Sequence, residues 1–388
     1  GGGDRNQATA NNAIVVGGTL NTASVACSFI GGGCSNSISS PYSQNKFDII
    51  VGGDNNTISN AYNSCNSTIV GGKDNSMSNA YGQFRFIGGG CCNCIDAYFS
   101  IGVIVGGKSN TLGGTYEGGF IGGGTSNSVC YSGNIVGGCC NFECGAYGFI
   151  GAGKNNSISA YQNAQSGIVT GCCNTISGAY CKQSFIGGGC RNIICSTNNA
   201  VIVGGILNTG SGACSFIGGG ISNQVTGINS SIVGGTLNTA SAACSFIGGG
   251  EDNKIIGDPA QLASRYWDVI VGGCKNKICG CCNTGWNSIL GGSCNTICAS
   301  YSSANSIIGG CQNIIGGSYR SYSIIGNGFN NCILAGACNG ILGGANNTLC
   351  DSHSFIIGSN ITSHAACTTH VNNLTVSGSA GGTSVVMM

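Results

Sequence analysis

The chain has 388 residues, of which 73 are glycine, 28 are cysteine and two are proline. Only 6% of the residues are charged, the formal net charge is +1, and 41% are apolar. The 13 Lys and Arg residues are scattered, so the chain lacks the basic surface that nucleic-acid binding requires. The apolar content excludes intrinsic disorder, and the missing three-residue glycine period excludes collagen. No apolar run reaches the ~18 residues that a membrane-spanning helix needs.

Residues 13–360 consist of a short repeat, which follows a lead-in over residues 1–12. Each unit has a pair of apolar residues, a Gly-rich run, two variable residues and an Asn. We take the last glycine of each run as an anchor. An Asn follows three residues after every anchor, from Gly18 with Asn21 to Gly344 with Asn347. The anchors are 14 to 23 residues apart, which gives about 20 units.

A unit of this length holds two strands of four or five residues and cannot bury an apolar face alone. Stacking on its neighbours solves this problem, because each unit then covers the next. The Ile, Val and Phe residues favour strands, and the glycines permit tight turns. The sequence therefore predicts an all-β fold, a parallel β-solenoid of about 20 short rungs.

The Asn column is expected to be structural. Identical amides on successive rungs form a ladder of side-chain hydrogen bonds, and Asn also tolerates left-handed turn geometry. The first members of this predicted ladder are Asn21, Asn36, Asn56, Asn75, Asn93 and Asn110.

Two long insertions carry most of the chemical variety. They lie between Gly33 and Gly53 and between Gly250 and Gly273, and they contain both prolines. Insertions in solenoids emerge as loops on one face, which is often the binding face. The alternative is loop drift without a function. The candidate binding residues are Tyr42, Lys46, Arg265, Tyr266 and Trp267.

Residues 361–388 abandon the repeat. We interpret them as an end cap or as a junction to a further module, because an open solenoid end exposes unpaired strand edges.

The cysteines fall into columns when the units are aligned. Neighbours in one column lie about one strand spacing apart, which is within the ~4.4–6.8 Å Cα range of a disulfide. Cys172 with Cys190, and Cys279 with Cys298, are the pairs predicted first. Disulfides would indicate an oxidising destination, and buried unbonded thiols are the alternative. No metal is expected, because vicinal pairs such as 91–92 lack the spacing of a zinc site.

Catalytic motifs are missing from the sequence. The three histidines, His353, His364 and His370, all lie near the C-terminal end, and the carboxylates are dispersed. The glycine runs recur in nearly every unit without a following Lys-Ser or Lys-Thr, so they are not phosphate loops. We expect no enzymatic activity and no cofactor.

The unit Ser-[Phe/Ile]-[Ile/Val]-Gly-Gly-x-x-Asn-Thr-[Ala/Ile]-Ser resembles the repeat in the heads of trimeric autotransporter adhesins. It is also similar to β-solenoid segments of phage and large-virus fibre proteins. This resemblance covers residues 13–360, and the segment 366–376 looks like the stretch that follows such repeats. It implies a left-handed parallel β-roll, a homotrimer, and a place at the exposed end of an adhesive or structural fibre.

The expected function is that of a structural or adhesive fibre, outside the cell, on the cell surface or on the virion surface. Its expected partners are copies of itself, in a homotrimer or a longer filament, together with a host surface or glycan. One alternative is binding to ice or another regular lattice, suggested by recurring hydroxyl pairs such as Thr57/Ser59 and Ser76/Ser78. A second alternative is a glycan-binding or glycan-processing solenoid.

Overall fold

The computed structural model describes residues 2–41, 47–60, 65–79, 83–97, 101–114, 118–159, 165–178, 182–195, 198–257, 267–279, 285–300, 304–318, 322–334 and 336–373. The chain divides into two compact units, unit 1 over Gly1–Leu237 and unit 2 over Asn238–Met388. In these described ranges every regular element is a β-strand. The same ranges contain no helix with the length and hydropathy of a membrane span.

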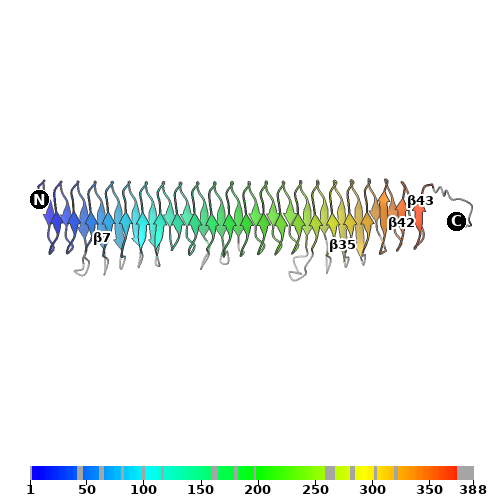
Figure 1. Ribbon diagram of the computed structural model, residues 1–388, viewed down its shortest axis with the longest axis horizontal. Coiled ribbons are helices and arrows are strands. Elements are labelled where there is room, and N and C mark those ends of the chain that lie inside the picture. The colour runs from blue at the N-terminus through cyan, green and yellow to red at the C-terminus, as the bar shows by residue number, and fades with distance from the viewer. Residues whose placement is uncertain are drawn as a thin grey trace, which may run out of the picture. The chain divides into compact units, whose positions relative to one another are not determined.

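Each coil of unit 1 contributes one strand to each of two parallel sheets, as the blue-to-green ribbon of Figure 1 shows. The first sheet consists of β1 (Gln7–Ala8), β3 (Thr22–Ala23), β5 (Ser37–Ser39), β7 (Thr57–Asn60), β9 (Ser76–Asn79), β11 (Cys94–Ala97), β13 (Thr111–Gly114), β15 (Ser128–Val129), β17 (Phe142–Glu143), β19 (Ser157–Ser159), β21 (Thr175–Ser177), β23 (Ile193–Cys195), β25 (Thr209–Gly210) and β27 (Gln224–Val225). The second consists of β2 (Ile14–Val15), β4 (Phe29–Ile30), β6 (Ile49–Ile50), β8 (Thr68–Ile69), β10 (Phe86–Ile87), β12 (Gly102–Ile104), β14 (Gly119–Ile121), β16 (Asn134–Ile135), β18 (Phe149–Ile150), β20 (Gly167–Ile168), β22 (Phe185–Ile186), β24 (Val201–Ile202), β26 (Phe216–Ile217) and β28 (Ser231–Ile232).

Unit 2 repeats this arrangement. Its odd-numbered strands are β29 (Thr239–Ala240), β31 (Lys254–Ile256), β33 (Lys277–Cys279), β35 (Thr296–Ser300), β37 (Ile314–Ser318), β39 (Cys332–Ile333) and β41 (Thr348–Leu349). Its other sheet consists of β30 (Phe246–Ile247), β32 (Val269–Ile270), β34 (Ser288–Ile289), β36 (Ser306–Ile307), β38 (Ile324–Ile325), β40 (Gly340–Gly343), β42 (Phe355–Ile357) and β43 (Thr369–Val371).

Within each unit, a strand pairs in parallel with the corresponding strand of the next coil, for example β5 with β7 and β33 with β35. The all-β parallel β-solenoid is therefore confirmed. The strands are shorter than the expected four or five residues, since many have only two. The reason is a second left-handed corner in many coils, occupied by residues such as Phe47 and Trp267, which interrupts the extended backbone.

The stacking also extends beyond residues 13–360. Strand β1 lies in the expected lead-in and pairs with β3, and β43 lies in the expected cap and pairs with β42. Gly3 and Asn6 already have the anchor spacing, and Asn6 Nδ2 donates to the Gly18 carbonyl at 2.8 Å. At the other end, β43 pairs in parallel with β42, and Asn372 Oδ1 accepts a hydrogen bond from the Ser359 amide at 2.6 Å.

The core of each coil is a narrow apolar layer between the two sheets. It consists of stacked aliphatic side chains that are fully buried, among them Ile38 and Ile58 on odd strands and Ile30 and Ile50 on even strands. Adjacent residues along a strand point outward, as the strand period of two requires. Hydroxyl pairs such as Thr57/Ser59 and Ser76/Ser78 thus lie in register on the outer side, and Cys94 and Asp96 take these positions in the next coil.

Glu143 interrupts the apolar column of unit 1. It lies in register between Val129 and Ile158 and is fully buried. Its Oε1 accepts a hydrogen bond from the Gly145 amide at 2.8 Å, and its Oε2 has no partner among the described residues. A Cβ at Gly133 or Gly148 would collide with this carboxyl, so these two glycines provide its space. Burial raises the pKa of Glu143 from 4.5 to about 8, against the opposing hydrogen bond from Gly145.

Replacing Glu143 by Gln is expected to flatten the dependence of stability on pH. A carboxyl whose pKa is raised in the folded state stabilises it fully below pH 4.5, and this contribution is lost as the pH rises to about 8. Burial also raises the pKa of Asp48 to about 6 and that of Asp268 to about 7, so their effects end at lower pH. The change in the urea midpoint between pH 7 and pH 8 measures the pH-dependent contribution of Glu143 to stability. If the urea midpoint changed equally with pH in the wild type and in E143Q, the raised pKa assigned to Glu143 would be contradicted.

Candidate functional site: the glycine–asparagine corner and its exposed columns

The anchor glycines form a corner where successive coils approach most closely. Gly72 has φ +91°, a left-handed conformation that glycine adopts without strain. A Cβ at Gly72 would lie 2.8 Å from the Gly90 amide nitrogen and closer still to the Gly90 carbonyl oxygen. Only glycine fits this contact, which sets the close approach of neighbouring coils.

The Asn side chains fill the inside of this corner. Asn56 Oδ1 accepts hydrogen bonds from the amide nitrogen and Nδ2 of Asn75, both at 3.1 Å. Asn75 Nδ2 also donates to the carbonyls of Gly71 in its own coil, at 3.0 Å, and Gly90 in the next, at 3.1 Å. The same buried position is occupied by Asn21, Asn36, Asn56, Asn75, Asn93 and Asn110. These amides therefore join adjacent coils and are inaccessible to a ligand.

Replacing Asn75 by Ala is expected to destabilise unit 1 by about 2 kcal/mol or more, because several buried backbone groups lose their partner. Asn55 is the matched control, since it lies next to Asn56 but is exposed and donates to Asp74 instead. Asn55→Ala is expected to cost well under 1 kcal/mol. Denaturant unfolding followed by circular dichroism compares the two variants, and equal losses would contradict a ladder-specific role.

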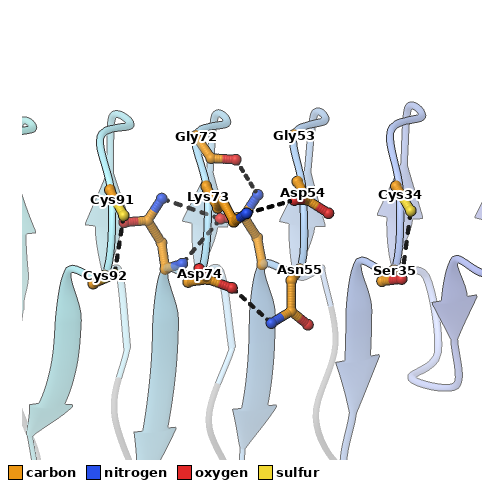
Figure 2. Close-up of polar contacts among 12 residues, drawn as sticks. Cys34, Ser35, Gly53, Asp54, Asn55, Gly72, Lys73, Asp74, Cys91 and Cys92 are labelled. Atoms are coloured by element: carbon orange, nitrogen blue, oxygen red, sulfur yellow. Dashed lines mark hydrogen bonds and ion pairs between the residues drawn. The ribbon is translucent and has the colours of Figure 1, made fainter.

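The two residues after each anchor form columns on the outside of the corner, which we name the corner columns. The first column places Cys34, Asp54, Lys73, Cys91 and Lys108 in register. The second contains Ser35, Asn55, Asp74, Cys92 and Ser109, each with φ between 54° and 59°. Figure 2 shows this part of unit 1.

Charges and amides connect successive coils along these columns. Lys73 Nζ lies 3.4 Å from Asp54 Oδ2, and this hydrogen-bonded contact raises the pKa of Lys73. Asn55 Nδ2 donates to Asp74 Oδ1 at 2.7 Å (Figure 2). Exposed ion pairs contribute little to stability, so we expect these contacts to add little to the cohesion of the coils.

Vicinal cysteines occupy both corner columns in three coils. The two Sγ atoms lie 2.9 Å apart in Cys91–Cys92, and 3.2 Å apart in both Cys139–Cys140 and Cys172–Cys173. The hydrogen bond with Cys91 raises the pKa of the Cys92 thiol, and burial adds to it, whereas the charge of Lys108 lowers it.

The predicted cysteine pairs both lie in register. Cys279 and Cys298, in β33 and β35, form a disulfide with a Cα–Cα distance of 4.7 Å. Cys172 and Cys190 are neighbours in the first corner column, and both are thiols here, so their pairing stays a prediction. Cys130 and Cys144 follow β15 and β17 in adjacent coils, and burial followed by a contact with Cys144 raises the pKa of Cys130 to about 12.

Of the predicted loop residues, Tyr42, Lys46, Arg265 and Tyr266 lie outside the described residues. Trp267 is described, is half-exposed, and lies next to Trp286 with ring centroids 6.4 Å apart and planes inclined by 34°. The sequence analysis missed Trp286. The signal for it is its position two residues before the first residue of the following strand, which Trp267 and Tyr322 share. Aligning the units on these strands would have revealed it.

A buried polar network in unit 1 was also missed. Arg85 is buried and donates to the Ser78 carbonyl at 2.6 Å, to Asn60 Oδ1 and to Ser67 Oγ at 3.3 Å. Asp48 accepts hydrogen bonds from Asn60 Nδ2 at 2.9 Å and from the Ser67 amide at 3.0 Å. This network pairs most of its buried polar groups, although Arg85 Nε has no hydrogen-bond partner among the described residues, and we assign it a structural role.

Comparisons with protein-family models and with curated proteins found no match for this chain. The resemblance to adhesin heads and fibre proteins therefore stays an expectation.

Proposed function

We propose that this protein is a structural, non-enzymatic fibre component that assembles with copies of itself outside the cell or on a virion surface. The proposal includes the left-handed, homotrimeric arrangement that the resemblance to adhesin heads and viral fibres implies. Its main support is an apolar stripe on the outer side of the even-numbered strands.

The stripe in unit 1 follows a two-coil pattern from β10 to β28. One coil presents a Phe before the buried Ile and a Gly after it, and the next presents a Val after the Ile. The side chains are Phe86, Val105, Phe120, Val136, Phe149, Val169, Phe185, Val203, Phe216 and Val233. In the Phe coils the ring lies against the glycine, since a Cβ at Gly88 would be 3.3 Å from Phe86 Cε1. Unit 2 has the same pattern in β30 and β32.

The area of the stripe fits a protein–protein interface. Its Val residues are about half exposed and several of its Phe residues are 36–42% exposed. Ten such side chains leave on the order of 600–700 Å² of apolar surface uncovered. Standard interfaces bury about 800 Å² per partner, and exposed apolar patches of this size mark interaction sites.

A second copy of the chain is the partner that suits the stripe best. The stripe contains no charged residue, so it offers no electrostatic selection for a different protein. A second copy presents the same side chains at the same coil spacing, so contacts repeat along the stripe in one register.

The full chain is expected to have a solution mass near three times 38.5 kDa by analytical ultracentrifugation. Replacing Val136 and Val203 together by Lys is expected to shift it towards the monomer, because buried charges are costly in an apolar interface. The matched control carries Lys at Ser59 and Thr111, which are exposed on the other sheet. A wild-type monomer at micromolar concentration, or equal dissociation of both variants, would refute the proposal.

A second candidate function is the binding of a neutral glycan in unit 2. Trp267, Trp286 and Tyr322 occupy equivalent positions in their coils and are 50–70% exposed. Exposed aromatic rings provide apolar faces with a polar edge, which suits sugar rings. The net charge of +1 argues against nucleic acid as the stacking partner.

Trp286→Ala is expected to weaken glycan binding at least tenfold, as loss of a central aromatic contact does at other binding surfaces. Phe47→Ala is the control, because Phe47 is an exposed aromatic at the equivalent position of a unit 1 coil. A glycan array followed by calorimetry on a bound sugar measures both variants. Unchanged affinity in W286A would remove this candidate.

A further inference from the structure

Three side chains from two successive coils of unit 1 converge at the corner columns. The ligand atoms of Asp74, Cys91 and Cys92 all lie within 4.8 Å of one another. We propose that this cluster binds a thiophilic divalent cation of the zinc group, with Zn²⁺ as the natural ion and Cd²⁺ as a close chemical probe. Two thiolates and one carboxylate form a ligand set that suits these ions.

The backbone brings the two sulfurs to the same side. Cys92 has φ 59°, and this left-handed turn directs its side chain towards that of Cys91, as Figure 2 shows. Their Sγ atoms are 2.9 Å apart. A tetrahedral ion with metal–sulfur bonds of about 2.3 Å holds its sulfurs about 3.7 Å apart. The pair has to open by less than about 1 Å, which the exposed Cys92 side chain achieves by a small rotation.

The third ligand is held in place by its own partner. Asp74 lies one coil before Cys92 in the second corner column, and Asn55 Nδ2 donates to its Oδ1 at 2.7 Å. This hydrogen bond fixes the carboxylate and leaves Oδ2 for the cation. Such outer partners orient ligands in protein metal sites, and losing one typically costs 10- to 100-fold in affinity.

The charges around the cluster also suit a divalent cation. Two thiolates and one carboxylate carry three negative charges, so binding of a divalent cation leaves the cluster with one net negative charge. Lys108 follows Cys91 in the first corner column and offsets this remaining charge, whereas Lys73 is paired with Asp54. Three protein ligands leave a fourth position, which water fills in an exposed site.

The other vicinal pairs provide natural comparisons within the same chain. Cys139–Cys140 has the same corner geometry, and Ser126 takes the place of Asp74 in the coil before it, with φ 55°. The sequence analysis expected no metal because it considered the spacing of ligands along the chain and not the side chain in the same column of the coil before. The carboxylate comes from a neighbouring coil, 17 residues before Cys91.

The test is a Cd²⁺ titration of the full, freshly reduced chain against a chelator, followed by the ultraviolet thiolate-to-cadmium charge-transfer band. The wild-type chain is expected to bind one equivalent of Cd²⁺ at this cluster, more tightly than the other thiols of the chain bind Cd²⁺. Asp74→Asn keeps every thiol and is expected to weaken that equivalent at least tenfold. Ser126→Asp creates the same three ligands at Cys139–Cys140, with Ser109 behind the new carboxylate in place of Asn55, and is expected to add a second equivalent that binds more weakly than the first but more tightly than the remaining thiols.

Both substitutions lie on the outside of the corner, so circular dichroism is expected to stay unchanged. Identical titrations of D74N and the wild type would overturn the proposal, since binding would then depend on thiols alone. No added equivalent in S126D would overturn it as well. Peptide mapping of the freshly isolated protein provides an independent measurement, and a disulfide joining Cys91 to Cys92 there would also overturn it.

Discussion

The contact between anchor glycines and the Asn side chain beside them is the constraint on which each unit depends. The glycine lets the next coil come so close that any side chain would collide with its carbonyl. The Asn amide then bonds to the coil before and the coil after, so it provides hydrogen-bond partners for backbone carbonyls of the buried corner. Without both residues the coils would neither approach nor keep their register.

A fixed register turns every position of the coil into a column. The innermost columns are the buried Ile residues, which supply the apolar layer. The outermost positions do not have to be apolar, and there the side chains differ from coil to coil. The apolar stripe, the Trp267–Trp286 pair and the Asp74–Cys91–Cys92 cluster all lie at outward positions. The scaffold thus separates the side chains that hold the coils together from those that face the solvent.

A few acidic and basic side chains are buried in the interior instead of facing the solvent. Glu143 takes a core position because Gly133 and Gly148 leave it space, and Asp48 and Arg85 lie among the amides and hydroxyls of three coils. Burial without a full set of partners is unfavourable to the charged form, which is why the pKa values of these carboxyls rise. Among the described residues of unit 1, these three are the buried acidic and basic side chains, and Asp268 is a further buried carboxyl in unit 2.

The amino-acid sequence was sufficient to predict the parallel stacking, the anchor glycines and the position of the Asn ladder, because these features recur at a spacing that only stacked coils explain. It also indicated the register of Cys279 with Cys298. It did not determine the short strands, since the second left-handed corner uses ordinary residues such as Phe47 and Trp286 instead of glycine.

The packing of the folded coils sets which side-chain atoms come into contact across coils. Asp74 joins Cys91 and Cys92, and Arg85 reaches Asn60, across separations that differ from coil to coil because the insertions differ in length. Asp74 and Cys92 each follow an anchor glycine by two residues, so alignment of the anchors puts them in one column, but it does not show that the ligand atoms of Asp74, Cys91 and Cys92 come within 4.8 Å of one another. Arg85 and Asn60 lie in the parts of the coils whose length differs between anchors, so the alignment does not make them neighbours. Neighbours across coils follow from the fixed register of the strands, and that register is a property of the folded stack.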